Sequence, residues 1–120
     1  MKDNLIKEKT FAFSLLIIQL YKKLLEEKEY IISKQLLRSA TGIGANVVEA
    51  EAAQSRKDFI SKMCIASKEA RETKYWLELL EQSELTKIEL EEYQKEINSI
   101  NKIITSIVKT TIENDRTLNN

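Results

Sequence analysis

The chain of 120 residues contains no proline and only two glycines. Folds built from many strands use these residues at their turns, because proline fixes φ and glycine tolerates unusual backbone conformations. Their scarcity, together with 42% apolar and 32% charged residues, predicts a soluble all-α protein made of a few long helices. The length fits a single domain that covers residues 1–120.

Histidine is absent, which removes the usual general base at neutral pH and the commonest transition-metal ligand. A carboxylate-bridged di-iron bundle is thereby excluded. Gly42 and Gly44 lack the third glycine of a dinucleotide-binding loop, and Glu69 with Glu72 is more typical of salt bridges than of catalysis. We predict no catalytic residue, metal, cofactor or small-molecule substrate; a site built between subunits is the remaining enzymatic alternative.

The single cysteine, Cys64, cannot form an internal disulfide, so we predict a cytoplasmic protein. Because Met63 and Ile65 flank it, Cys64 is predicted to be a buried structural thiol and not a nucleophile. The longest apolar run, residues 11–20, is too short for a membrane span and lacks the cleavage region of a signal peptide. No membrane association is therefore expected.

Four stretches repeat apolar residues at spacings of three and four, which is the pattern of amphipathic helices. Their matched lengths predict an antiparallel up-down-up-down four-helix bundle. The four apolar seams are Ile6, Phe13, Ile17, Leu20 and Leu24; Leu36, Ala40, Ile43, Val47 and Ala50; Phe59, Met63, Ala66, Ala70, Thr73, Leu77 and Leu80; and Leu90, Tyr93, Ile97, Ile100, Ile104, Ile107 and Thr111.

Hydroxyl side chains mark the expected starts of three of these helices, because they accept hydrogen bonds from unpaired backbone N–H groups. Ser33 is a possible cap for the second helix, and Ser55 with Asp58 forms a variant of the capping box for the third. The fourth helix is expected to begin near Thr86, and the polar segment 113–120 is predicted to fray.

The first helix has more apolar residues than one seam requires. Leu15, Ile18 and Leu25 lie outside the seam, and we predict that they form a contact between subunits of a homo-oligomer. The alternative is that they are scattered exposed apolar residues, which are common on soluble proteins.

The second helix contains a run of small residues at 39–45, within which each glycine costs about 1 kcal/mol relative to alanine. We interpret this run as a close crossing with another helix, the alternative being a local kink or a break. Polar residues flank it: Arg38, Asn46 and Glu49 are predicted to form a buried network with residues of the third helix, namely Glu69, Arg71 or Glu72.

The net charge is zero, but it is unevenly placed. Residues 54–76 carry six cations against three acids, whereas residues 77–100 carry seven acids against two cations. A basic helix beside an acidic one is typical of a solvated surface with partial neutralisation. The functional alternative is a phosphate-binding patch formed by Arg56, Lys57 and Lys62.

Three segments carry a family resemblance: RSATGIGANVVEA at 38–50, SRKDF at 55–59 and KEARETKYWLELL at 68–80. Their most specific elements are Asn-x-x-Glu at 46–49 and Glu-x-x-Tyr-Trp-Leu at 72–77. Over essentially its whole length the chain resembles the four-helix-bundle proteins first associated with intervening sequences in bacterial 23S ribosomal RNA. The resemblance implies a ring-like homopentamer without enzymatic activity, and relatives of the fold include the accessory variability protein of diversity-generating retroelements, a basic pentamer that binds nucleic acid.

Two functional hypotheses follow. The first is a non-enzymatic, homo-oligomeric binding module for RNA, DNA or a nucleic-acid-associated protein such as a ribonucleoprotein partner, with contacts from Arg38, Arg56, Lys57 and Lys62. The second is a protein-interaction scaffold that does not bind nucleic acid. The resemblance favours the first hypothesis, whereas the neutral charge favours the second.

Overall fold

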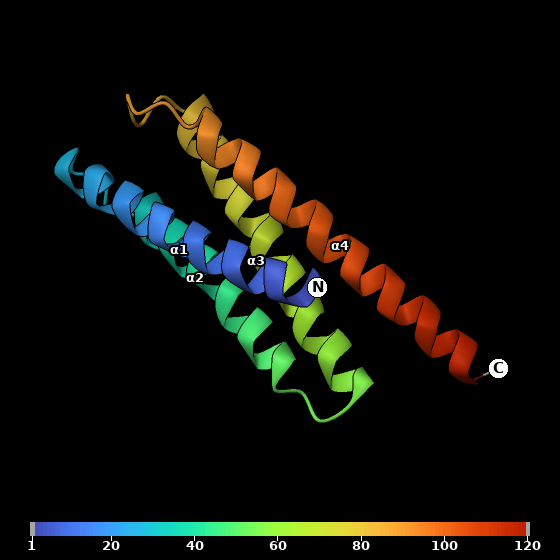
Figure 1. Ribbon diagram of the computed structural model, residues 1–120. Helices are drawn as coiled ribbons and strands as arrows, with labels where there is room; N and C mark the ends of the chain where they lie inside the picture. The colour runs from blue at the N-terminus through green and yellow to red at the C-terminus, as the bar shows by residue number, and fades with distance from the viewer. Residues whose placement is uncertain (1, 120) are drawn as a thin grey trace.

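The computed structural model describes the backbone of residues 2–119 and the side chains of residues 5–116. Within residues 2–119 the chain forms four helices and no strand: α1 (Lys2–Glu26), α2 (Ile32–Glu51), α3 (Arg56–Gln82) and α4 (Glu91–Asn119). Successive helices run in opposite directions along a body of 54 × 23 × 22 Å (Figure 1). Each helix packs on two others, α1 on α2 and α4, and α3 on α2 and α4. The predicted up-down-up-down bundle is confirmed.

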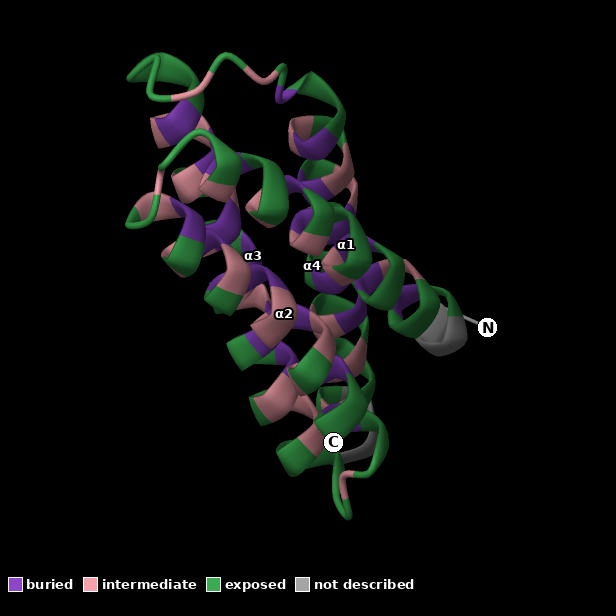
Figure 2. Cartoon of the chain, turned by 90° about the vertical axis from the view of Figure 1, so that its left-hand side faces the viewer, coloured by how far each residue is buried: buried purple, intermediate pink, exposed green. Residues whose placement is uncertain are grey.

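The core is formed by the four apolar seams, which turn toward the bundle axis (Figure 2). Every predicted seam residue is buried except Phe59 and Thr111, which are half-buried at the end of the bundle where α3 begins. Removing this apolar surface from water is the main source of stability for helices that carry so many charges on their outer faces.

The start of α3 agrees with its predicted cap, whereas the start of α2 does not. Ser55 is extended, and its Oγ accepts a hydrogen bond of 3.0 Å from the Asp58 N–H. At α2 the cap is instead the carboxylate of Glu29, which accepts from the N–H groups of Ile31, Ile32 and Ser33 at 3.0, 3.1 and 2.5 Å. A carboxylate suits this place because several unpaired N–H groups and the positive end of the helix dipole face it.

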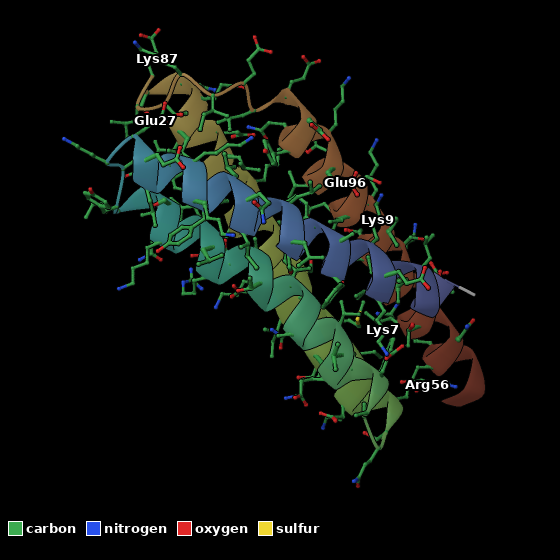
Figure 3. The ribbon with its side chains drawn as sticks, turned by 60° about the vertical axis from the view of Figure 1, so that its left-hand side comes forward. Lys7, Lys9, Glu27, Arg56, Lys87 and Glu96 are labelled. Carbon is green, nitrogen blue, oxygen red and sulfur yellow. The ribbon has the colours of Figure 1, made fainter. Side chains whose placement is uncertain are left out.

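The fourth helix begins at Glu91, five residues later than the predicted start near Thr86. The Thr86 hydroxyl donates to the Glu27 carboxylate and accepts from the Ile88 N–H at 3.1 Å, and the Lys87 N–H donates to Glu27 at 3.3 Å. Thr86 therefore holds the α3–α4 loop against the end of α1 and does not cap a helix. Figure 3 shows Glu27 and Lys87 together at this end.

The other end of α4 is longer than predicted. The helix continues to Asn119 and so includes most of the segment 113–120 for which we expected fraying, while residue 120 lies outside the described residues. No proline or glycine interrupts the chain there. In addition, Ile112 is half-buried, and an ion pair of 3.8 Å joins Asp115 to Arg56 at the start of α3.

The small-residue run lies inside an uninterrupted α2, where its two glycines face different neighbours. A Cβ atom on Gly42 would lie 2.9 Å from Glu69 Oε2 of α3. A Cβ atom on Gly44 would lie 3.6 Å from Thr10 and Ser14 of α1. The predicted close approach is confirmed, and it involves both helices that flank α2.

These two glycines predict different responses to alanine. Gly44→Ala should raise the free energy of unfolding by about 0.5–1 kcal/mol, because the methyl group reaches ordinary contact distance and alanine favours the helix. Gly42→Ala should gain less or lose stability, because its methyl group must push Glu69 aside. Urea denaturation of both variants tests this expectation, and equal gains would contradict it.

Candidate functional site

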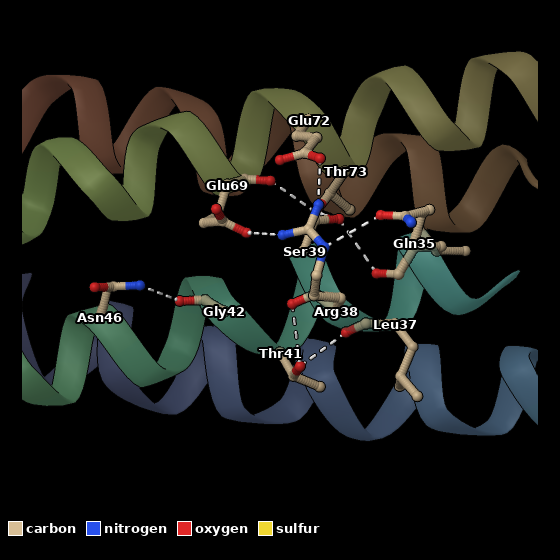
Figure 4. A network of polar contacts seen from close by, with 11 residues as sticks. Gln35, Leu37, Arg38, Ser39, Thr41, Gly42, Asn46, Glu69, Glu72 and Thr73 are labelled. Carbon is tan, nitrogen blue, oxygen red and sulfur yellow. Dashed lines mark hydrogen bonds and ion pairs between the residues drawn. The ribbon is translucent and has the colours of Figure 1, made fainter. Parts of the chain in front are cut away.

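The most developed polar cluster joins α2 to α3 (Figure 4). Arg38 Nη1 lies 3.2 Å from Glu69 Oε2, its Nη2 donates to Glu72, and its Nε donates to Gln35 at 3.2 Å. Glu69 and Glu72 are three residues apart on α3, so both face the guanidinium. The Glu69 side chain is only 13% exposed, whereas Arg38 is 49% exposed. Arg38 is therefore engaged in an ion pair within the bundle.

Next to this ion pair lies a buried pair of hydroxyl groups. The Oγ1 atom of Thr73 is 2.8 Å from the Oγ atom of Ser39, and both side chains are fully buried. Each hydroxyl is also within hydrogen-bond distance of a carbonyl oxygen of its own helix. The Ser39 Oγ atom is 3.3 Å from the Leu36 oxygen, and the Thr73 Oγ1 atom is 2.8 Å from the Glu69 oxygen. The pair therefore satisfies its hydrogen-bonding groups without water.

Two of the predicted network residues are elsewhere. Asn46 donates to the Gly42 carbonyl oxygen of its own helix at 2.8 Å, and Glu49 is exposed. The reason is the antiparallel register: Glu69 lies opposite Gly42, so Asn46 and Glu49 are about 6 and 10 Å further along the axis from it. Arg38 thus contacts Glu69 and Glu72 across the two helices, in a cluster that is partly exposed and not buried as expected, whereas Asn46 and Glu49 lie outside it.

The four cations predicted to contact phosphate do not form one patch. Arg38 belongs to the network with Glu69, which is about 20 Å along α3 from Arg56. Arg56, labelled in Figure 3, is exposed and pairs with Asp115. Lys57 is exposed, and Lys62, five residues further along α3, is half-buried. The start of α3 thus keeps a basic surface, but Arg38 is not part of it.

Three cations line a groove between α3 and α4: Arg71, a candidate for the buried network that is exposed and outside it, and Lys109 and Arg116, which the sequence analysis assigns to no site. This α3–α4 groove has a volume of about 590 Å³, and its lining residues are Cys64, Ser67, Arg71, Thr105, Val108, Lys109, Ile112, Glu113 and Arg116. Arg71, Lys109 and Arg116 are all exposed. The sequence contains a signal for this groove, because residues seven apart share a helix face. Cys64 and Arg71 have this spacing on α3, and Lys109 and Arg116 have it on α4.

The same groove corrects the prediction for Cys64, which is exposed and not buried. Its neighbour Met63 is in the core, but one residue along a helix is a rotation of about 100°, so Cys64 turns outward.

Apolar side chains also remain on the surface of α1. Phe11 is 66% and Leu15 51% exposed, and Ile18 on the same face is half-buried, as is Leu25. We call Phe11, Leu15 and Ile18 the α1 apolar strip. Beside the strip, Phe11 joins Gly44, Ala45 and Val48 of α2 in lining a groove of about 580 Å³. The predicted interface residues thus lie at or near the surface of the single chain.

The described residues contain neither a membrane-spanning helix nor a cluster of metal ligands. Over residues 2–119 no helix has the length and hydropathy that a bilayer crossing requires. Across the described part of the chain, no three metal-ligating side chains gather closely enough to hold an ion.

The fold defines an all-α, up-down four-helix bundle with a basic groove on one side and an apolar strip on another. The sequence model of the 23S rRNA-intervening sequence proteins matches residues 2–106, and the chain belongs to this family. A crystal structure from Bacteroides thetaiotaomicron VPI-5482, of a protein with unknown function from the S23 ribosomal protein family, is 53% identical with a TM-score of 0.87. The match covers 91% of this chain and 99% of that one. No curated protein matches the chain.

The ion pair between α2 and α3 leads to a stability prediction. Arg38→Met should lower the free energy of unfolding by about 1 kcal/mol, because it leaves the largely buried Glu69 carboxylate without its cation. Lys95→Met is the matched control, since its pair with Glu91 is 77% and 78% exposed and should contribute less than about 0.5 kcal/mol. Urea denaturation measures both, and an unchanged Arg38→Met variant would contradict a structural role.

Proposed function

We propose that this protein is a non-enzymatic, homo-oligomeric binding module of the cytoplasm whose ligand is nucleic acid or a ribonucleoprotein partner. The observation that carries the proposal is the basic surface at the α3–α4 groove, whose described lining holds three cations and one acid in a chain whose net charge is zero. The three cations are Arg71, Lys109 and Arg116, and Lys57 is exposed on the same face of α3 as Arg71. Local cations attract phosphates even where the whole protein is neutral, because charge interactions are screened within about 10 Å at 0.1 M salt.

Self-association is supported by the α1 apolar strip. An exposed phenylalanine and leucine on one helix face, beside the groove lined by Val48, form a continuous apolar surface of the kind that marks protein interfaces. The proposed assembly is a ring of five copies, which is the arrangement that the family resemblance implies. Such a ring would repeat the basic surface five times and strengthen weak contacts with a long polyanion.

The proposal of a non-enzymatic role is supported by the side chains available. Without histidine, a general base at neutral pH would have to be a carboxylate or lysine with a strongly displaced pKa.

A protein-interaction scaffold is the second candidate. It is favoured by the groove between α1 and α2, whose lining includes the exposed Phe11 and Val48. In this case the partner would be a protein with an apolar helix face, and the basic surface would only keep the oligomer in solution.

The deciding experiment is a titration of the purified protein with structured RNA and with duplex and single-stranded DNA at two salt concentrations. The assembly mass is recorded in the same buffers. Binding with a steep decrease at higher salt supports the first candidate, since each neutralised phosphate releases counterions. An intact oligomer that binds none of these probes at low salt would favour the scaffold.

The oligomer interface has its own test. Leu15→Glu should shift the protein toward monomers, because it places a charge in an apolar contact. Asn98→Glu is the control, since it adds the same charge at an exposed position of α4, outside the α1 apolar strip. Light scattering at micromolar concentration measures the mass. A wild-type monomer, or an unchanged mass for Leu15→Glu, would contradict the role of the strip.

A further inference from the structure

The α3–α4 groove is lined by residues of two neighbouring helices. Figure 1 shows these helices running antiparallel. Arg71 stands on the α3 side, and Lys109 and Arg116 stand on the α4 side. The lining contains one carboxylate among its described side chains, that of Glu113, so the groove carries two net positive charges. It is therefore a concentrated positive site in a protein without net charge.

The three cations of the groove are available to a ligand. Across residues 5–116, none of them forms an ion pair, whereas Arg56 at the start of α3 is paired with Asp115. An unpaired cation can bind a phosphate without first breaking an ion pair with a carboxylate. The free energy of the new charge-assisted hydrogen bond is then not reduced by the loss of an existing one.

The cations form rows and not a single point. Lys109 and Arg116 are seven residues apart, which is about 10 Å along α4. On α3, Lys57 lies fourteen residues before Arg71 on the same helix face and extends the row by about 21 Å. Two cationic rows along a channel match a linear polyanion better than they match one small anion.

The floor of the groove is less polar than its rim. Val108 and Ile112 are half-buried between the cations, and Ser67 and Thr105 add hydroxyl groups. A duplex keeps its bases paired inside and presents phosphates outward, so it could touch the rim but could not fill the floor. An unpaired strand can place phosphates at the rim and a sugar or base against the floor.

We propose that the α3–α4 groove is a binding site for the backbone of single-stranded nucleic acid. Arg71, Lys109 and Arg116 bind its phosphates, and Val108 with Ile112 contacts the unpaired nucleotides. This inference rests on the proposed nucleic-acid ligand and names the strand type and the site. Because the lining holds no aromatic ring for stacking, the site should show little preference between base sequences.

The first test removes the three charges together. The variant R71Q/K109Q/R116Q is compared with K22Q/K23Q/K34Q, which loses the same charge from exposed lysines of α1 and α2. Binding of fluorescein-labelled oligouridylate is followed by anisotropy over a salt series. The groove variant should bind at least about tenfold more weakly, and its salt slope should fall by about 2, at 0.7 per phosphate lost. The control should change less than about threefold, because its lysines lie outside the contact.

Two further probes test the strand type. Oligothymidylate should bind similarly to oligouridylate, because the contacts are to the backbone. A duplex of equal length should bind more weakly than either. A duplex that binds as tightly as the single strands would overturn the assignment to single-stranded nucleic acid.

The second test uses Cys64, the chain's single cysteine, which is exposed in the groove. Alkylation by iodoacetamide should be fast in the free protein and several-fold slower with saturating oligouridylate. This readout uses the wild-type protein and so does not depend on the folding of a variant. Slow alkylation of the free protein would show that the groove is already covered, which would overturn the site.

The two proposals fail in different ways. If the wild-type protein binds no nucleic acid at low salt, both the proposed function and this site are wrong. If it binds oligouridylate, but the groove variant binds as well as the control and Cys64 is not protected, the function stands and the groove is not the site.

Discussion

The close approach of α2 to α3 is the constraint on which the other contacts depend. It is possible because the facing stretches are made of small residues, with Gly42 on one helix and buried Ala66 and Ala70 on the other. The short separation brings Arg38 within hydrogen-bond distance of Glu69 and buries the Ser39–Thr73 pair. These polar contacts favour one position of α2 along α3, because a shift by one turn would separate the two buried hydroxyls from each other and the Glu69 carboxylate from Arg38.

The other two helices pack against this pair, α1 on α2 and α4 on α3. Gly44 gives α1 its close contact with α2, and Asn101 of α4 donates to the Ala70 carbonyl oxygen of α3 at 3.5 Å. An ion pair of 2.7 Å between Lys9 and Glu96 then connects α1 with α4 across the closing side of the bundle (Figure 3). The arrangement leaves two outer grooves with different chemistry. The groove between α1 and α2 exposes the apolar side chains of Phe11 and Val48 beside Lys7 and Glu8, whose charges are opposite, and the groove between α3 and α4 is cationic.

This separation is what the two proposed roles, self-association and binding of a polyanion, require of a neutral protein. The apolar strip and the cations are on different pairs of helices, so an interface on α1 need not cover the α3–α4 groove. Three of the five acids of α4, Glu91, Glu92 and Glu96, lie in its first two turns, whereas Lys109 and Arg116 lie in its second half together with Glu113 and Asp115. The positive charge of the α3–α4 groove therefore depends on Arg71 of α3 together with Lys109 and Arg116, and salt screens the more distant acids at the start of α4.

The sequence by itself determined the helices and the core, because its apolar residues recur with the helical period of 3.6 and so lie on one face of each helix. It also determined the cap at Ser55, where donor and acceptor are three residues apart. Only the tertiary structure decided contacts between distant segments. These contacts are the hydrogen bond between Thr86 and Glu27 and the ion pair between Arg38 and Glu69. The groove that Arg71 shares with Lys109 and Arg116 is also formed only in the tertiary structure. The physical reason is that side-chain position around one helix follows from spacing alone, whereas the register between two helices depends on how closely their backbones can approach.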